Sequence, residues 1–145
     1  MKVRLLALTV CTALASCGST SRAIDVEATA QERQVLSGEE ITRAFSDVRD
    51  AAEIQDAAGT TAVNHWHGDG RFLNRWKNAA SSGEVTGSWR VVGDLRCVLI
   101  RSGLQGAIGK EKCSPVYKAG ERYVSINDDG SVHAFHTLTP LLENP

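Results

Sequence analysis

Turn signals recur at short intervals from about residue 50 onward, and the segments between them have the length and composition of β-strands. The turns are Gly68-Asp69-Gly70, Gly93-Asp94, Ala119-Gly120 and Asn127-Asp128-Asp129-Gly130. Glycine, aspartate and asparagine favour tight turns because they tolerate the backbone angles that such turns need. About seven strands, each followed closely by the next, predict an antiparallel meander. We therefore expect a mainly β domain, a curled sheet or small barrel, with one short N-terminal helix.

Alternating side chains define the central strand most clearly. Val85, Gly87, Trp89 and Val91 alternate with polar residues, so one face of this strand should face the core and Arg90 should face solvent. The other expected strands are residues 62–67, 71–77, 95–101, 113–118, 122–126 and 131–138.

One short helix should precede the strands. Residues 37–40, Ser-Gly-Glu-Glu, have the spacing of a capping box, in which the serine and the second glutamate satisfy each other's backbone amides. Ile41, Ala44, Phe45 and Val48 follow at helical spacing. This apolar stripe is narrow, so we expect the helix to pack on the sheet.

The chain opens with Lys2 and Arg4, followed by an apolar run that is shorter than the roughly 20 residues of a membrane-spanning helix. The run ends in Leu14-Ala15-Ser16-Cys17, which resembles the lipobox of bacterial lipoproteins. The resemblance implies cleavage before Cys17 and several acyl chains on it, and Gly18 implies the periplasmic face of an outer membrane. The alternative is a secreted protein cut after Ala15.

The lipoprotein resemblance divides the chain into a signal peptide at residues 1–16, a flexible tether at 17–36 and a single domain at 37–145. Cleavage before Cys17 removes Lys2 and Arg4 and leaves 14 basic and 17 acidic residues. This mildly acidic balance disfavours nucleic acid as a partner.

Cys97 and Cys113 remain as an even pair after Cys11 is lost and Cys17 is acylated. In an oxidising compartment such a pair is expected to form a disulfide. A metal pair and a catalytic thiol are the alternatives, but the chain has no Cys-x-x-Cys and no histidine close in sequence to either cysteine.

His65 and His67 are weak candidates for a metal site. Residues two apart share a face of a strand, so both imidazoles could hold one cation, with His133 and His136 as further ligands. Against this, Trp66 should take the core side and leave both histidines in solvent. We expect no metal and no cofactor.

A basic stripe is expected from Arg71, Arg75 and Lys77, which alternate on one strand. It is either a solvated face or a docking site for an acidic envelope partner.

Three further family resemblances are present. Residues 37–41, 66–70 and 87–89, with Cys97 and Cys113, resemble uncharacterised envelope β-domains of alphaproteobacteria. This resemblance implies a fold and no activity. Gly87-Ser88-Trp89 with a cysteine on the next strand is also similar to lipocalin-like inhibitors of bacterial metalloproteases. Residues 119–123 are faintly similar to a motif of lysozyme inhibitors, whose second motif is missing here.

Sequence motifs for catalysis are lacking. The chain has no Gly-x-Ser-x-Gly, no phosphate-binding loop and no zinc-protease motif, so we do not expect an enzyme. The sequence favours a lipid-anchored binding or structural module that faces the periplasm and engages an envelope protein or the cell wall. The alternative is an inhibitor of a periplasmic hydrolase such as a protease or lysozyme.

Overall fold

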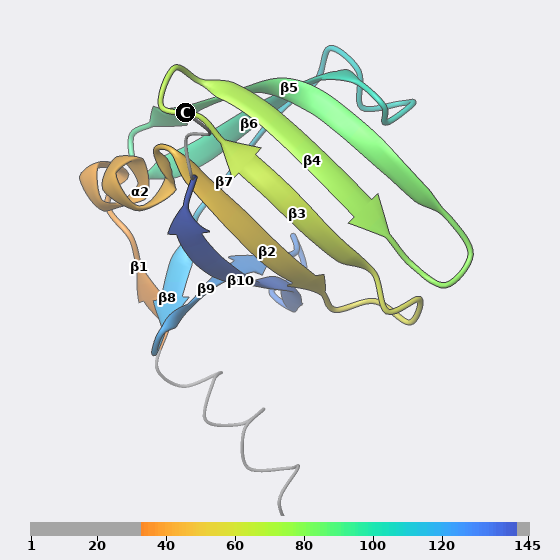
Figure 1. The fold of residues 1–145 in the computed structure, drawn as a ribbon. Helices are drawn as coiled ribbons and strands as arrows, with labels where there is room; N and C mark the ends of the chain where they lie inside the picture. Colours follow the sequence, from red (N-terminus) through yellow and green to blue (C-terminus); the bar gives the residue numbers. More distant parts are fainter. Residues whose placement is uncertain (1–32, 142–145) are drawn as a thin grey trace, which may run out of the picture.

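The computed structural model describes residues 33–141, which form an antiparallel sheet curled into a half-barrel, with one short helix (Figure 1). The mainly β, curled-sheet fold expected from the sequence is confirmed. Within the described range the elements are β1 (Gln34–Val35), α2 (Gly38–Phe45), β2 (Val48–Ile54), β3 (Thr61–Trp66), β4 (Arg71–Lys77), β5 (Ser82–Val92), β6 (Leu95–Ser102), β7 (Glu111–Ser114), β8 (Tyr117–Ala119), β9 (Arg122–Ile126) and β10 (Val132–Pro140).

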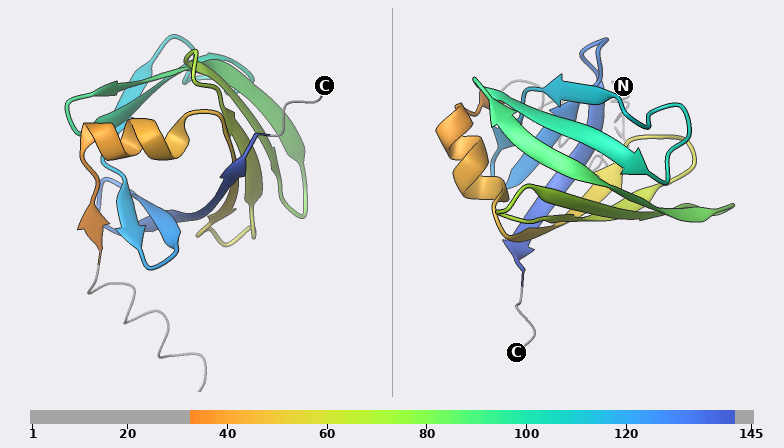
Figure 2. Two further views of the ribbon diagram at one scale, coloured as in Figure 1. Left: turned by 60° about the vertical axis from the view of Figure 1, so that its left-hand side comes forward. Right: turned by 90° about the horizontal axis from the view of Figure 1, so that it is seen from above.

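Two meanders make up the sheet, whose strand order is β1-β8-β9-β10-β2-β3-β4-β5-β6-β7. Strands β2 to β7 run neighbour to neighbour, as do β8 to β10. The last strand, β10, then pairs with β2, whereas β7 and β8 are not paired. The sheet therefore curls round an interior but stays open between β7 and β1, and α2 crosses one end of it (Figure 2).

Two differences from the expected elements have local causes. The segment expected as a single strand at 113–118 is split into β7 and β8 around Pro115, because proline has no amide to donate to a sheet. Val48 was expected on the helix but begins β2. The helix ends at Phe45, and Asp47 adopts a left-handed φ of 56°, which redirects the chain.

The folded domain begins earlier than residue 37, where the sequence places its boundary. Gln34 and Val35 form β1 against β8, and the amide of Leu36 donates to the Val116 carbonyl at 2.9 Å. Leu36 is buried. Residues 33–36 therefore belong to the domain and not to the tether, and residues 17–32 lie outside the described part.

The capping box at the start of α2 is confirmed. The Ser37 side chain accepts from the Glu40 amide, and a Glu40 carboxylate oxygen accepts from the Ser37 amide at 2.8 Å. The helix buries Ile41 and Phe45 against the inner face of the sheet. Phe45 meets the Trp66 ring edge to face at a centroid distance of 5.8 Å. Burial of these large side chains is the main force that holds the helix on the sheet.

Candidate functional site

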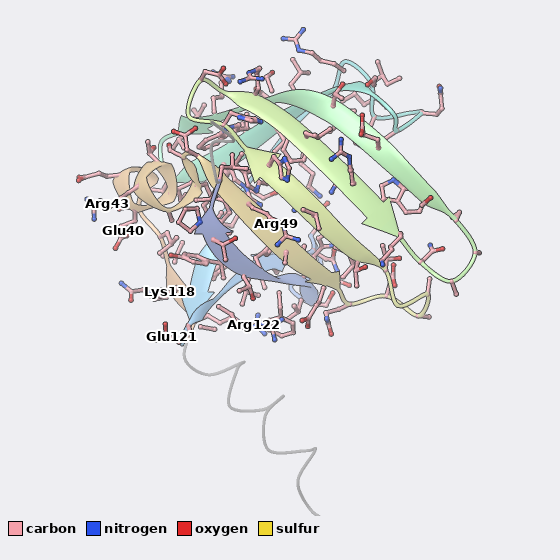
Figure 3. All side chains as sticks on the ribbon, in the orientation of Figure 1. Glu40, Arg43, Arg49, Lys118, Glu121 and Arg122 are labelled. Atoms are coloured by element: carbon pink, nitrogen blue, oxygen red, sulfur yellow. A yellow bond between two sulfur atoms is a disulfide. The ribbon has the colours of Figure 1, made fainter. Side chains whose placement is uncertain are left out.

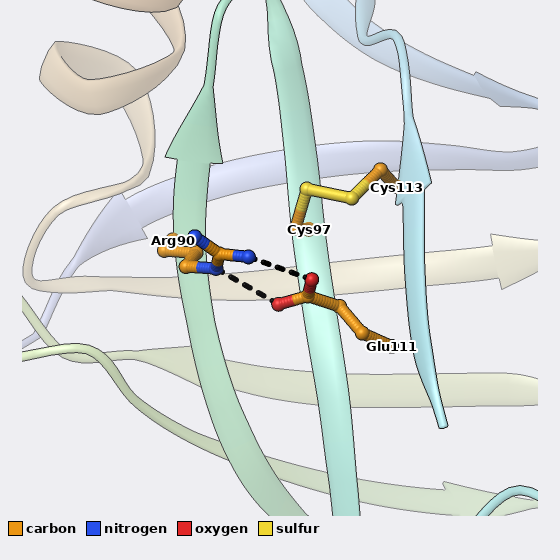
Figure 4. The surroundings of a disulfide bond; sticks show 4 residues. All are labelled: Arg90, Cys97, Glu111 and Cys113. Atoms are coloured by element: carbon orange, nitrogen blue, oxygen red, sulfur yellow. Dashed lines mark hydrogen bonds and ion pairs between the residues drawn. A yellow bond between two sulfur atoms is a disulfide. The ribbon is translucent and has the colours of Figure 1, made fainter. Parts of the chain in front are cut away.

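The Cys97–Cys113 disulfide expected from the sequence is present. The two cysteines lie directly opposite each other on β6 and β7, and the bond closes a sequence separation of 16 residues. Beside it, Arg90 donates two hydrogen bonds to Glu111, at 2.9 and 2.8 Å (Figure 4). Arg90 is exposed, as its place in the alternating pattern predicts. The disulfide therefore ties the edge strand β7 to the rest of the sheet.

His65 and His67 lie on either side of Trp66, which is 3% exposed and faces the core as expected. Their ring centroids are 6.4 Å apart. Burial, with the charges of Arg75, His67 and Arg49, holds the pKa of His65 below its usual range.

A third ligand does not approach the two histidines within residues 33–141. There, three close ligand groups gather only at Cys97, Glu111 and Cys113, and the two sulfur atoms are bonded to each other.

The expected basic stripe on β4 is largely paired with acids. Arg71 binds Asp69 at 2.7 Å, and Arg75 binds Glu84 at 2.8 Å. Elsewhere on the surface, acidic and basic side chains lie close together around α2 and the β8–β9 hairpin (Figure 3). They are Glu40, Arg43, Lys118, Glu121 and Arg122. Two of the three cations of the stripe are therefore balanced by neighbouring acids.

A cavity of about 290 Å³ lies inside the half-barrel. Seven strands contribute to its walls. Its lining contains apolar side chains together with amide, hydroxyl and basic side chains. The lining residues are Ala52, Ile54, Ala62, Asn64, Trp66, Phe72, Asn74, Arg96, Val98, Lys112, Ser114, Ser125, Ile126, Asn127, His133 and His136.

The acid behind this cavity is Asp50 on β2, which is fully buried. Its carboxylate accepts from Asn64 Nδ2 at 2.9 Å, from Trp66 Nε1 at 3.1 Å and from His136 Nδ1 at 2.9 Å. Burial alone would raise the pKa of Asp50. The hydrogen bond and charge of His136, the Trp66 bond and the charge of Arg96 outweigh it, so the pKa is lowered and the group is ionised at neutral pH.

His136 continues the network toward β9. Its Nε2 lies 3.0 Å from the Ser125 hydroxyl, and Ser125 lines the cavity. A shift of register between Val132 and Ala134 interrupts the pairing of β9 with β10. His133 lines the same cavity as His136, although the two are three residues apart on one strand. An irregularity of this kind can redirect a side chain to the other face of a strand.

Arg96 on β6 also faces the cavity. Its guanidinium lies 4.5 Å from the Phe45 ring centroid and 4.4 Å from that of Trp66, a geometry that attracts a cation. Its Nη1 is shielded from solvent and has no hydrogen-bond partner. Burial lowers the pKa of Arg96 to about 10 while the charge of Asp50 opposes the shift, so Arg96 stays charged at neutral pH.

Sequence reasoning missed Asp50, Arg96 and Ser125. It considered His136 only as a metal ligand, and this residue is hydrogen-bonded on both nitrogens inside the sheet instead. One signal was available: Asn64 alternates with Trp66 and must share its inner face. A polar side chain there requires a buried partner. The sequence gives no means of identifying that partner as Asp50.

Comparison with known proteins finds no match: no family model, curated protein or solved structure is similar to the chain. In the described residues no helix has the length and apolarity to cross a membrane.

Proposed function

We propose that the protein is a lipid-anchored envelope module that binds a small anionic molecule, such as a carboxylate, in the cavity of its half-barrel. The anchor is Cys17, which lies outside the described residues, and the support for it is the Leu14-Ala15-Ser16-Cys17 tetrad. The Cys97–Cys113 disulfide is consistent with an oxidising compartment.

The single observation that carries the binding proposal is the state of Arg96. No hydrogen bond or ion pair joins its guanidinium to any other residue of the described range, although the group lines a cavity. A partly buried guanidinium with free donors is costly, and a bidentate acceptor such as a carboxylate would satisfy it. An anionic ligand would therefore supply the hydrogen-bond acceptor that Arg96 lacks in the protein.

The rest of the lining favours the same ligand class. It contains no aspartate or glutamate, and its basic side chains are Arg96, Lys112, His133 and His136. Lys112 also forms an ion pair with Asp128 at 3.3 Å. Asp50 lies behind the wall, and its acceptor oxygens are already engaged by three donors. The volume, about 290 Å³, is at the lower end for ligand pockets, which points to a small molecule with a short apolar part.

Calorimetric titration with hexanoate, against hexanol as the neutral control, tests this proposal. Hexanoate should bind and hexanol should bind much more weakly. Arg96→Met should weaken hexanoate binding by about tenfold or more, because a hydrogen bond to a charged group contributes about 1.5–3 kcal/mol. Arg101→Met, on the same strand but exposed, is the matched control. Equal affinity of both variants would count against the proposal.

The anchor is tested separately by growing cells with an alkyne-tagged fatty acid. Wild type and the Cys11→Ser control should take up the tag, and Cys17→Ser should not. Retention of the tag by Cys17→Ser would contradict the assignment.

A further inference from the structure

Three strands that are neighbours in the sheet bring together a hydroxyl, an imidazole and a carboxylate. Ser125 lies on β9, His136 on β10 and Asp50 on β2, in the sheet order β9-β10-β2. Ser125 Oγ is 3.0 Å from His136 Nε2, and His136 Nδ1 is 2.9 and 3.0 Å from the two oxygens of Asp50. The His136 imidazole therefore contacts Ser125 through one nitrogen and Asp50 through the other.

The chemistry of Asp50 fixes the direction of one of these bonds, and the protonation of His136 sets the direction of the other. Ionised Asp50 can only accept, so Nδ1 of His136 carries the proton that is donated to it. When the imidazole is neutral, Nε2 is an acceptor and the Ser125 hydroxyl donates to it; when the imidazole is protonated, Nε2 donates to Ser125 Oγ, and only the neutral form can act as a base. This order, with a base next to a hydroxyl and an acid orienting the base, is the arrangement that activates a serine nucleophile.

The carboxylate is held rigidly. Asn64 and Trp66 donate to it in addition to His136, and the Asn64 amide oxygen accepts from Asn74 Nδ2. Asp50 is out of contact with solvent, whereas Ser125 is half-buried and lines the cavity. The Asp50 end of the network is thus buried, and the Ser125 hydroxyl end is accessible from the cavity.

We propose that Ser125 is a nucleophile for acyl transfer, with His136 as its base and Asp50 as the residue that positions His136, acting on small carboxylic esters. Ser125 Oγ bonds to the carbonyl carbon while its proton passes to His136 Nε2. The carbon–oxygen bond to the alcohol then breaks, and the alcohol leaves with that proton. Water attacks the acyl-serine by the same route in reverse, which frees the acid and restores the hydroxyl.

This activity goes beyond the proposed binding role but uses the same cavity. Arg96 contributes positive charge to the wall of the same cavity, which favours the carboxylate product. The absence of a serine-hydrolase motif in the sequence is no obstacle, because such arrangements are defined by geometry and not by order along the chain.

Labelling of the folded protein with diisopropyl fluorophosphate tests the inference. The Ser125 oxygen would bond to phosphorus, fluoride would leave, and intact-mass and peptide spectra should show one adduct, on Ser125. Ser125→Ala should abolish it. Ser88→Ala, a half-buried serine on β5 away from the cavity, should label like wild type. A wild-type protein without an adduct, or with one elsewhere, overturns the inference.

The His136→Asn variant tests whether His136 activates Ser125 or only fills a polar part of the core. The asparagine amide can still donate to Asp50, so the fold should be kept, which circular dichroism checks, but the base is gone. Labelling should slow at least about a hundredfold, the usual contribution of a general base. His65→Asn, outside the cavity, should leave the rate unchanged. An unchanged rate in His136→Asn would reduce the arrangement to a structural network.

Acid-quenched incubation with p-nitrophenyl acetate extends the test to an ester, and an acetyl group should be found on Ser125. Hexanoate titration of the same sample distinguishes the two proposals. If hexanoate binds but Ser125 is not labelled, only the proposal that Ser125 is a nucleophile is overturned. If Ser125 is labelled but hexanoate does not bind, only the proposal that the cavity prefers anions is overturned.

Discussion

The two faces of the curled sheet use the same charged residue types in opposite ways. On the outer face, Arg90 and Glu111 pair in solvent, with side-chain exposures of 63% and 33%. On the inner face, Asp50 is fully buried and receives three hydrogen bonds, while Arg96 has none. Exposed ion pairs stabilise little, whereas a buried charge that lacks partners lowers the stability of the fold. Charged groups should therefore affect the stability of the fold far more on the inner face than on the outer face.

Removing the inner acid should have the largest effect. Asp50→Ala leaves three buried donors without an acceptor and should lower the free energy of unfolding by about 3–5 kcal/mol. Urea denaturation followed by circular dichroism measures it. Asp69→Ala, an exposed acid in the turn between β3 and β4, should hardly move the midpoint. Similar midpoints for the two variants would refute the contrast between the faces.

Loss of the disulfide should come next. The Cys97→Ala/Cys113→Ala double variant releases a loop of 16 residues in sequence and should lose about 3 kcal/mol, mostly through the greater freedom of the unfolded chain. The same urea titration measures it, with wild type under reducing conditions as a second sample. A change well below 1 kcal/mol would mean that β7 is held in place without the bond.

Acid should weaken the inner face through Asp50. Because its pKa is lowered in the folded state, its contribution is present above its unfolded pKa of about 4 and is lost as the pH falls further. Asp50→Asn should flatten the fall of stability with pH in that acid range. Several exposed acids also have lowered pKa values, so Asp129→Asn provides the comparison and should flatten the curve less. Parallel curves for wild type and Asp50→Asn would contradict the assignment.

The outer ion pair should have the smallest effect. Glu111→Gln removes one charge of the Arg90 pair, which water and salt already screen. Its unfolding midpoint should stay close to that of wild type and become indistinguishable from it in high salt. A large loss of stability would show that the outer face also depends on its charges.

Sequence reasoning succeeded where the information is local. Residues 71–77 and 122–126 were predicted with the observed bounds, since turns flank both strands. The capping box and the disulfide were also predictable, the first from spacing and the second from an even pair. Val48–Ile54 was missed as a strand because Val48 continues the apolar spacing of the helix, and only the backbone turn at Asp47 separates the two.

The site was not predictable for a different reason. Asp50, Ser125 and His136 are brought together by pairing between β2, β9 and β10, and Asp50 and His136 are 86 residues apart in sequence. A lone aspartate at the start of a strand and a serine in a short hairpin have no local pattern that indicates burial or reactivity. Their meaning depends on strand order, which composition and spacing do not determine.

Pairing of β10 with β2 also determines when the half-barrel can fold. The half-barrel cannot curl, and Asp50 cannot find His136, until nearly the whole chain is present, since residues 134–140 pair with residues 48–54. Contacts this distant in sequence make folding slow, because a long loop must close before they form. The cavity should therefore close only once β10 has been made and has paired with β2.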